Sequence, residues 1–102
     1  MEKINLEYTL YTIKTTDKFD KQLRKIERQN KDLNKLMIVI SMIANKQRLG
    51  FKYRNHKLSK SKEYKDCFEC HIEPDWLLVY QYEDSKLNLL LIATGSHSEL
   101  FK

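Results

Sequence analysis

Three histidines are the residues of this sequence whose chemistry points most directly to a reaction. His56, His71 and His97 all lie in the second half of the chain, each near the end of an expected structural element. An imidazole titrates near neutral pH and can accept and donate a proton within one turnover. Cleavage of RNA by its own 2′-hydroxyl needs little more than a base, an acid and cations around the phosphate. An RNA-cleaving site is therefore one interpretation, although a single histidine on a half-apolar strand is more often structural.

Acidic and aromatic residues follow His71 closely. Asp75 and Trp76 come directly after the only proline, Pro74. A carboxylate could assist proton transfer, and an aromatic ring could stack on a base that is splayed out of a single strand. The ordinary alternatives are that Asp75 is a turn residue and that Trp76 belongs to the core. The spacing alone does not decide between these interpretations.

Positive charge is concentrated in one segment of the chain. Residues 46–65 contain eight basic residues and one acidic residue, a net charge of +7, whereas residues 66–102 contain two basic and seven acidic residues. A concentrated positive field attracts polyanions and speeds their encounter. A solubilising loop is the alternative. We call this segment the basic loop, and it is centred on Arg48, Lys52, Arg54, Lys57, Lys60, Lys62 and Lys65.

The two cysteines, Cys67 and Cys70, have the C-x-x-C spacing of some redox and zinc sites. The segment around them is predicted to be a strand, in which residues three apart point to opposite faces. A closed zinc site also needs four ligands, and His71 is the one further candidate nearby. We therefore expect two ordinary buried thiols, and no metal or cofactor.

The elements that must position these residues follow from the hydrophobic pattern. Residues 8–15 are rich in β-branched and aromatic side chains and predict a first strand. Two helices joined by a short break at Asn30 or Asp32 should form an antiparallel hairpin. The first helix is capped at Thr15, Thr16 or Asp17. The apolar stripes of the two helices consist of Phe19, Leu23 and Ile26, and of Leu33, Leu36, Met37, Ile40, Ile43 and Ala44.

Three further strands are expected after the basic loop, at residues 65–72, 76–82 and 87–93. The last two are nearly apolar on both faces, as central strands covered by helices would be. The predicted fold is α+β: an N-terminal strand, a helical hairpin and a three-stranded antiparallel meander in one sheet. At 102 residues, the chain should form one domain, residues 1–102.

No apolar stretch reaches the ~20 residues that a membrane crossing needs. The first five residues, M-E-K-I-N, do not resemble the apolar core of a signal peptide. We therefore expect a cytoplasmic protein with no membrane partner.

Three segments resemble the RelE/YafQ toxins, and the YafQ branch in particular. Residues 70–80 (C-H-I-E-P-D-W-L-L-V-Y) look like the H-x-E/K-P-D-W-x-L-x-Y signature of YafQ-type toxins. Residues 53–58 (Y-R-N-H-K-L) resemble the Y-x-D-H-x-L segment of that family, and residues 94–101 (T-G-S-H-S-E-L-F) are similar to its terminal T-G-T/S-H-x-x-L-F. The first strand and the helical hairpin also match, so the resemblance covers nearly the whole chain. It implies a RelE-like fold.

The resemblance also implies a function and a site. The chain would be the toxin of a type II toxin–antitoxin pair and would cleave mRNA in the ribosomal A site without a metal. His97 would be the general acid, and His56, His71 and Asp75 would supply the base and hold the 2′-hydroxyl and phosphate. Which of these groups removes the proton stays open, because coupled groups share their titrations. Trp76 and Phe101 would position substrate or ring.

The sequence departs from the family pattern at two arginine positions, where Phe68 and Ala93 stand, and lacks a glycine near Asp66. One such donor at a transition-state phosphate is worth roughly a hundredfold in rate. Arg54, Lys57 or Lys65 could substitute as substrate-binding cations, but a lysine is a point charge and not a planar fork.

The resemblance further implies a cognate RelB/DinJ-like antitoxin, whose acidic segment would fold across the basic loop. The ribosome and mRNA would be the other partners, and operator DNA would be bound only through the antitoxin complex. Two alternatives remain open. One is a weakly catalytic or non-catalytic RelE-fold module that binds RNA or antitoxin, and the other is a ParE-like inhibitor of DNA gyrase.

Overall fold

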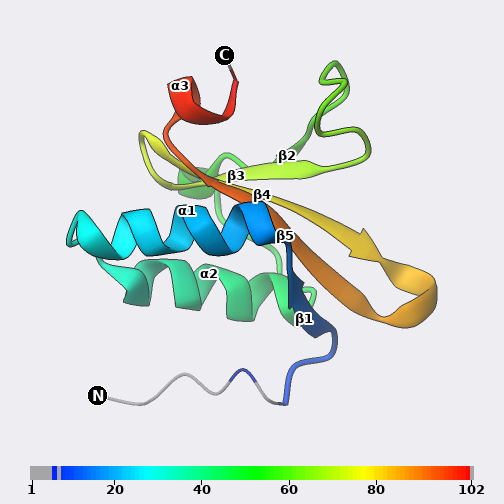
Figure 1. The fold of residues 1–102 in the computed structure, drawn as a ribbon. Coiled ribbons are helices and arrows are strands. Elements are labelled where there is room, and N and C mark those ends of the chain that lie inside the picture. Colours follow the sequence, from blue (N-terminus) through cyan, green and yellow to red (C-terminus); the bar gives the residue numbers. More distant parts are fainter. Residues whose placement is uncertain (1–5, 7, 102) are drawn as a thin grey trace.

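The computed structural model describes residue 6 and residues 8–101 (Figure 1). The N-terminal segment M-E-K-I-N, on which the expectation about a signal peptide rests, lies outside the described residues. Within the described residues, no helix is long and apolar enough to cross a membrane.

The described chain forms one five-stranded mixed sheet in the order β1-β5-β4-β3-β2. The predicted antiparallel meander is present as β3, β4 and β5, and β1 pairs with β5 in parallel. The first strand is shorter than predicted, because residues 8–11 lie outside it, and β3 starts three residues later than expected. The strands are β1 Thr12–Thr15, β2 His56–Lys57, β3 Phe68–Glu73, β4 Trp76–Glu83 and β5 Asn88–Gly95.

The predicted helical hairpin consists of α1 (Asp17–Arg28) and α2 (Leu33–Ala44), which cover one face of the sheet (Figure 1). Thr16 caps α1, because its hydroxyl oxygen accepts a hydrogen bond from the backbone N–H of Phe19 at 3.0 Å. Asp32 caps α2 through the N–H of Asn34. The predicted stripes face the sheet with one exception: Met37 is exposed, and Val39, which was not predicted, is buried in its place. The main core includes Phe19, Ile26, Leu36, Val39, Ile40, Ile43, Cys70, Trp76, Leu78, Tyr80, Leu89 and Leu91.

The opposite face of the sheet, which we call the outer face, carries a second and smaller core. The second part of the basic loop, with Leu58 and Tyr64, and a short C-terminal helix, α3 (His97–Leu100), lie against it (Figure 1), whereas Leu49 and Tyr53 of the same loop pack against the main core. The buried residues of the smaller core are Tyr64, Cys67, Leu77, Val79, Ala93 and Leu100. Neither α3 nor the two-residue strand β2 was predicted from the sequence.

The structure confirms the prediction that the two cysteines point to opposite faces of the sheet. Cys70 belongs to the main core and Cys67 to the core on the outer face, and both are buried free thiols. Burial raises the pKa of Cys70 to about 12 and also raises that of Cys67. Such thiols are poor nucleophiles.

Candidate active site

Strand register brings the first two histidines to one face of the sheet. His56 on β2 pairs with Glu69 on β3, Glu69 pairs with Val79 on β4, and Val79 pairs with Ala93 on β5. Residues opposite each other in antiparallel strands point to the same face. Since Val79 and Ala93 belong to the outer core, His56 and Glu69 also lie on the outer face, as does His71, two residues after Glu69.

Glu69 lies between these two histidines. It is only 6% exposed, and its Oε1 lies 3.2 Å from Nε2 of His71. Its Oε2 lies 4.0 Å from Nε2 of His56. A buried carboxylate is costly unless other polar groups compensate for the loss of water. The two imidazoles are the groups placed to do so.

The tautomers of both rings follow from their other nitrogens. Nδ1 of His56 lies 2.8 Å from the carbonyl oxygen of Arg54, and Nδ1 of His71 lies 3.1 Å from that of Pro74. A carbonyl can only accept, so each Nδ1 carries the proton and donates it. Each Nε2 therefore faces Glu69, and a proton taken up there would point at its carboxylate.

The two histidines differ in their access to solvent. The side chain of His71 is 16% exposed, and both of its nitrogens face groups of the protein. The side chain of His56 is 52% exposed. His56 is therefore the better placed of the two to meet a substrate.

The third histidine, His97, begins α3. Its backbone N–H donates to Oδ1 of Asp75 at 2.9 Å. Ser96 and Glu99 form a capping box around the same turn, in which Glu99 also pairs with Lys25 of α1. These contacts hold the pKa of Glu99 at about 2, mainly through Lys25 and then through Ser96.

One shallow cavity of about 330 Å³ brings His56 and His97 together. Glu69 lies in its wall, and Lys57 and Lys60 of the basic loop supply positive charge. Phe101 lines it too, with its ring 5.1 Å from that of His97. The cavity is thus lined by two histidines, a buried glutamate, two lysines and a phenylalanine.

Asp75 and His71 do not line this cavity. Asp75 lines a separate hollow with Gly95, Ser96 and Glu99, and it reaches the site through the backbone of His97. His71 reaches it through Glu69. Both residues are therefore placed to position other groups.

Two of the predicted substrate-binding residues lie elsewhere. Arg54 lines two neighbouring clefts, and the side chain of Lys65 is exposed at the end of the basic loop. The burial of Trp76 corrects the prediction that it contacts substrate. Trp76 is 1% exposed and therefore has no surface that a substrate could contact. Its Nε1 donates to the hydroxyl of Thr94 at 3.0 Å, within the main core.

The two positions that lack arginine differ in their relation to the site. Ala93 is buried on the outer face, in the same register row as His56 and Glu69. Phe68 packs against the main core, and its ring stacks on Tyr80 at 5.6 Å between centroids. Of these two positions, only position 93 therefore lies on the face that carries the histidines.

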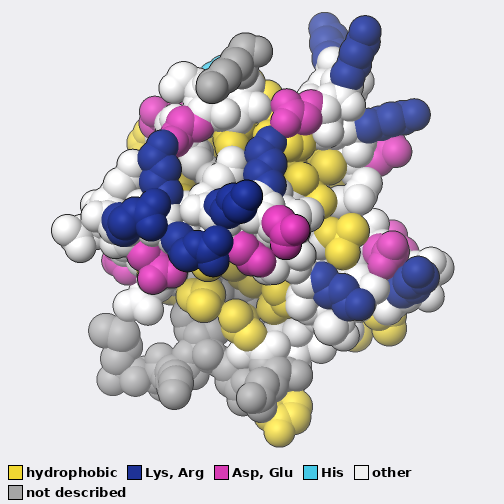
Figure 2. All heavy atoms as spheres, in the orientation of Figure 1, with side chains coloured by type: hydrophobic (Ala, Val, Ile, Leu, Met, Phe, Trp, Pro, Cys, Tyr) yellow, Lys and Arg dark blue, Asp and Glu magenta, His cyan; other side chains and the backbone are white. Residues whose placement is uncertain are grey.

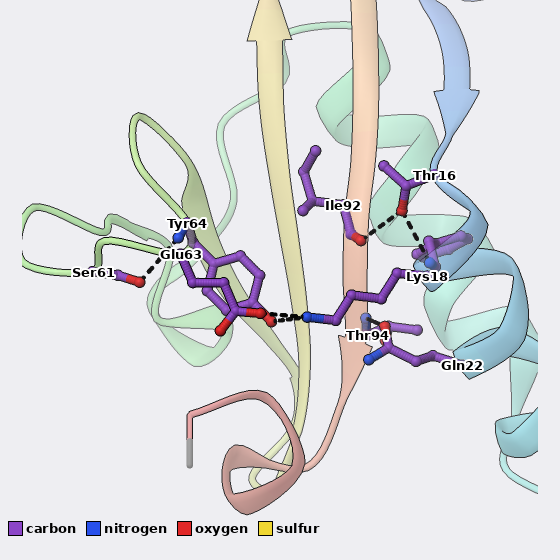
Figure 3. A network of polar contacts seen from close by, with 9 residues as sticks. Thr16, Lys18, Gln22, Ser61, Glu63, Tyr64, Ile92 and Thr94 are labelled. Carbon is purple, nitrogen blue, oxygen red and sulfur yellow. Dashed lines mark hydrogen bonds and ion pairs between the residues drawn. The ribbon is translucent and has the colours of Figure 1, made fainter.

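A polar clamp fixes the basic loop over the outer face (Figure 3). Nζ of Lys18, in the first turn of α1, lies 2.7 Å from both Oε1 of Glu63 and the hydroxyl of Tyr64. Tyr64 is buried, and its ring meets that of Phe101 edge-on at 5.5 Å. The clamp thus connects α1 to the aromatic residue beside His97.

Lysine and arginine side chains project from the basic loop and from α1 (Figure 2). Acidic side chains are interspersed among those of α1, whereas the tip of the loop carries mainly basic ones. The positive field near the cavity therefore comes mainly from the loop.

Sequence reasoning missed Glu69 and Tyr64. The signal for Glu69 was its position two residues before His71, which places both on one face of a strand. Tyr64 carried no comparable signal, because it lies in the irregular part of the basic loop. Among residues 6 and 8–101, no group of three or more histidine, cysteine or acidic side chains is arranged to hold a metal ion.

Comparison with known proteins identifies the relatives of this chain. Residues 11–102 match the family model described as the YafQ bacterial toxin of type II toxin–antitoxin systems. The mRNA interferase toxin YafQ of Escherichia coli K12 is 33% identical over 91 residues, which cover 87% of this chain and 94% of that protein.

Solved structures agree with these matches. A metal-bound toxin from Helicobacter pylori is 44% identical, with a TM-score of 0.81 over 87% of this chain and 97% of that one. The toxin of the E. coli DinJ–YafQ toxin–antitoxin complex is 30% identical, with a TM-score of 0.80 over 91% of this chain and 99% of that one. The mixed α+β fold is thus shared with these toxins.

Proposed function

The chain belongs to the YafQ family of bacterial type II toxins, and from that premise we propose that it is an mRNA endoribonuclease that cuts ribosome-bound message by histidine acid–base chemistry. Its curated relatives are named mRNA interferases. The observation that carries the proposal is the cavity in which His56 and His97 meet beside Lys57 and Lys60. Family membership also supports inhibition of translation as the consequence of cleavage.

In the proposed reaction, His56 removes the proton from the 2′-hydroxyl of the nucleotide before the scissile phosphate. The 2′-oxygen attacks phosphorus, the bond to the 5′-oxygen breaks, and His97 gives a proton to that leaving oxygen. The products are a 2′,3′-cyclic phosphate and a free 5′-hydroxyl. Lys57 and Lys60 offset the charge that builds up on the phosphate oxygens.

Positioning groups complete the proposed catalytic set. Nδ1 of His56 donates to the carbonyl of Arg54, so that its Nε2 is the nitrogen available for the incoming proton. His71 holds Glu69, which lies within 4.0 Å of that nitrogen. Asp75 fixes the start of α3 and with it the direction of His97. In this set, His56 and His97 transfer protons, whereas His71 and Asp75 position other groups.

A cognate antitoxin is the proposed physiological partner. The E. coli relative is seen in complex with DinJ. The basic loop offers such a partner a concentrated positive surface, and an acidic segment laid across it would cover Lys57, Lys60 and the cavity. Contact with operator DNA would come from the antitoxin.

Primer extension on mRNA translated in a purified system tests the nuclease proposal. We expect cuts within A-site codons, and a loss of rate of at least about a hundredfold for His97→Ala and for His56→Ala. Circular dichroism and thermal melts show whether each variant is still folded. Cleavage that persists at the original rate in both folded variants would refute the assignment.

A non-catalytic binding module is the second candidate, and Ala93 is the observation in its favour. The outer face lacks a guanidinium where relatives would carry one, so the barrier could be too high for turnover. Binding to programmed ribosomes without cuts would support this alternative. A supercoiling assay with purified gyrase tests the ParE-like possibility in the same preparation.

A further inference from the structure

A second cleft lies next to His71, between α2, the short helix η1 (Phe51–Tyr53) and the turn that joins β3 to β4. Its volume is about 490 Å³. Apolar and aromatic side chains form much of its wall, among them Ile38, Tyr53 and Pro74. Ile38 is an exposed residue of α2. An exposed apolar side chain in a concave site is a common feature of surfaces that bind a ligand.

The charges of the cleft favour an anionic ligand. Lys35, Lys52 and Arg54 line it, against a single carboxylate, that of Glu73. Glu73 is already paired with Lys35 at 2.9 Å. No carboxylate of the described residues lies within ion-pair distance of Lys52 or Arg54, and Nζ of Lys52 lies 5.0 Å from the centre of the Tyr53 ring. Two cations beside an aromatic ring suit a phosphate and its base.

The cleft and the cavity that holds His56 and His97 lie on either side of the contact between His71 and Glu69. His71 lines the cleft and touches Glu69, which lines the cavity. Arg54 also lines the cleft, while its carbonyl oxygen orients His56. Arg54 adopts a left-handed conformation (φ 46°), which turns the chain between the two sites. The two sites are therefore adjacent, and we take an RNA strand in the cavity to extend past His71 into the cleft.

We propose that this cleft binds the nucleotide next to the scissile phosphate of a single-stranded RNA. The base packs between Tyr53 and Ile38, and Lys52 and Arg54 hold its phosphate. The inference rests on the proposed function, since it takes RNA as the substrate of the neighbouring cavity. It adds a site at which the identity of the neighbouring base affects binding.

Photocrosslinking tests the cleft without requiring catalysis. The probe is a short mRNA on programmed ribosomes, with a 2′-O-methyl group that blocks attack and a 4-thiouridine on one or the other side of the scissile phosphate. We expect one of the two label positions to crosslink to the segment 52–54, as identified by mass spectrometry of the full-length protein. Crosslinks that never fall on this segment would overturn the inference.

Matched variants make the test specific. Lys52→Glu should lower the crosslinking yield at subsaturating protein roughly tenfold, about the effect of one lost stacked base or phosphate contact. Lys86→Glu, the same charge change in η2 (Asp84–Lys86), should leave it unchanged. If the two variants lowered the crosslinking yield equally, the effect would come from net charge alone, and the proposal would be overturned.

Two further measurements distinguish this proposal from the proposed nuclease function and from antitoxin binding at the same cleft. Parallel cleavage of the unmodified mRNA tests the proposed function by itself, so that cutting without crosslinks to 52–54 refutes only the cleft. Ile38→Asp should weaken crosslinking, with antitoxin binding unchanged. If Ile38→Asp instead weakened antitoxin binding and left crosslinking unchanged, the cleft would be a protein-docking site, and the assignment to RNA would be overturned.

Discussion

At the level of single residues, Glu69 is the group on which the arrangement of His56 and His71 depends. Its carboxylate faces Nε2 of both rings, while backbone carbonyls occupy both Nδ1 atoms. Glu69 faces the nitrogen that would take up the proton, and a nearby negative charge stabilises the imidazolium that forms. Glu69 is therefore a positioning residue whose loss should affect the chemical step more than binding.

Glu69→Gln should lower kcat about tenfold and change KM little, because the amide keeps the shape of the side chain but cannot offset a protonated ring. Steady-state cleavage of mRNA on ribosomes measures both constants. Glu83→Gln changes a carboxylate on β4 that pairs with Asn88, away from the cavity, and serves as the matched control. A rise in KM at constant kcat would contradict the proposed role.

The site residues illustrate what a sequence reveals at this scale. The histidines could be selected from side-chain chemistry and motif spacing, because few residue types titrate near neutrality. The distinct roles of His56 and His71 could not be predicted, because they depend on how far each ring is exposed and on which cavity it lines. The resemblance assigned Trp76 to substrate or ring, and the residues alone left open whether it belongs to the core. Its burial depends on the whole core, which the segment P-D-W does not specify.

At the level of elements, the short helix α3 controls the direction of His97. Glu99 closes its capping box and pairs with Lys25, and its pKa is lowered from 4.5 to about 2. A group whose pKa is lower in the folded protein adds stability above its unfolded pKa. That contribution is lost as the pH falls from about 4.5 towards about 2.

Glu99→Gln should remove this pH-dependent contribution and cost at most about 1 kcal/mol at neutral pH, because both partners are largely exposed and screened. The free energies of unfolding of the two proteins should converge as the pH falls through this range, which urea titrations at several pH values would measure. Glutamine can keep the capping bond to Ser96, so that the difference reports the charge. A constant difference from pH 4.5 down to pH 2 would contradict the assignment.

The Lys18 clamp is a second device at the level of elements. Lys18→Met should loosen the basic loop and raise the exchange rate of the Tyr64 and Cys67 amides about two- to fivefold, the effect of losing a partly exposed ion pair. Those amides donate within the loop, to Ser61 and Tyr64. Hydrogen exchange followed by NMR would measure the change. Lys21→Met on the same helix should leave both rates unchanged.

The elements themselves were predictable in proportion to their length. The hairpin and the meander have enough residues for a hydrophobic period to appear, and both were predicted. β2 has two residues and α3 has four, too few for any period. The parallel pairing of β1 with β5 was also missed, because it joins segments more than 70 residues apart and residues 12–15 do not specify their partner strand.

At the level of the whole molecule, charge is divided along the chain. The basic loop has a net charge of +7, whereas residues 66–102, which supply most of the sheet, contain seven acidic residues and two basic ones. Tyr64 and the clamp anchor the second part of the loop on the outer face, whereas Arg48, Lys52 and Arg54 line clefts beside α2. The fold thus combines an acidic framework with a cationic surface that extends from the cavity to the clefts beside α2.

Salt dependence tests whether that surface meets phosphates. For single strands, the slope of log K against log salt is about −0.7 for each phosphate neutralised. Lys57→Gln and Lys60→Gln should each therefore reduce the magnitude of the slope for a non-cleavable RNA by about 0.7, because both lysines line the cavity. Lys21→Gln and Lys86→Gln remove the same charge elsewhere and should leave the slope unchanged. If all four variants gave the same slope as the parent protein, the basic loop would serve solubility and would not be an RNA-binding surface.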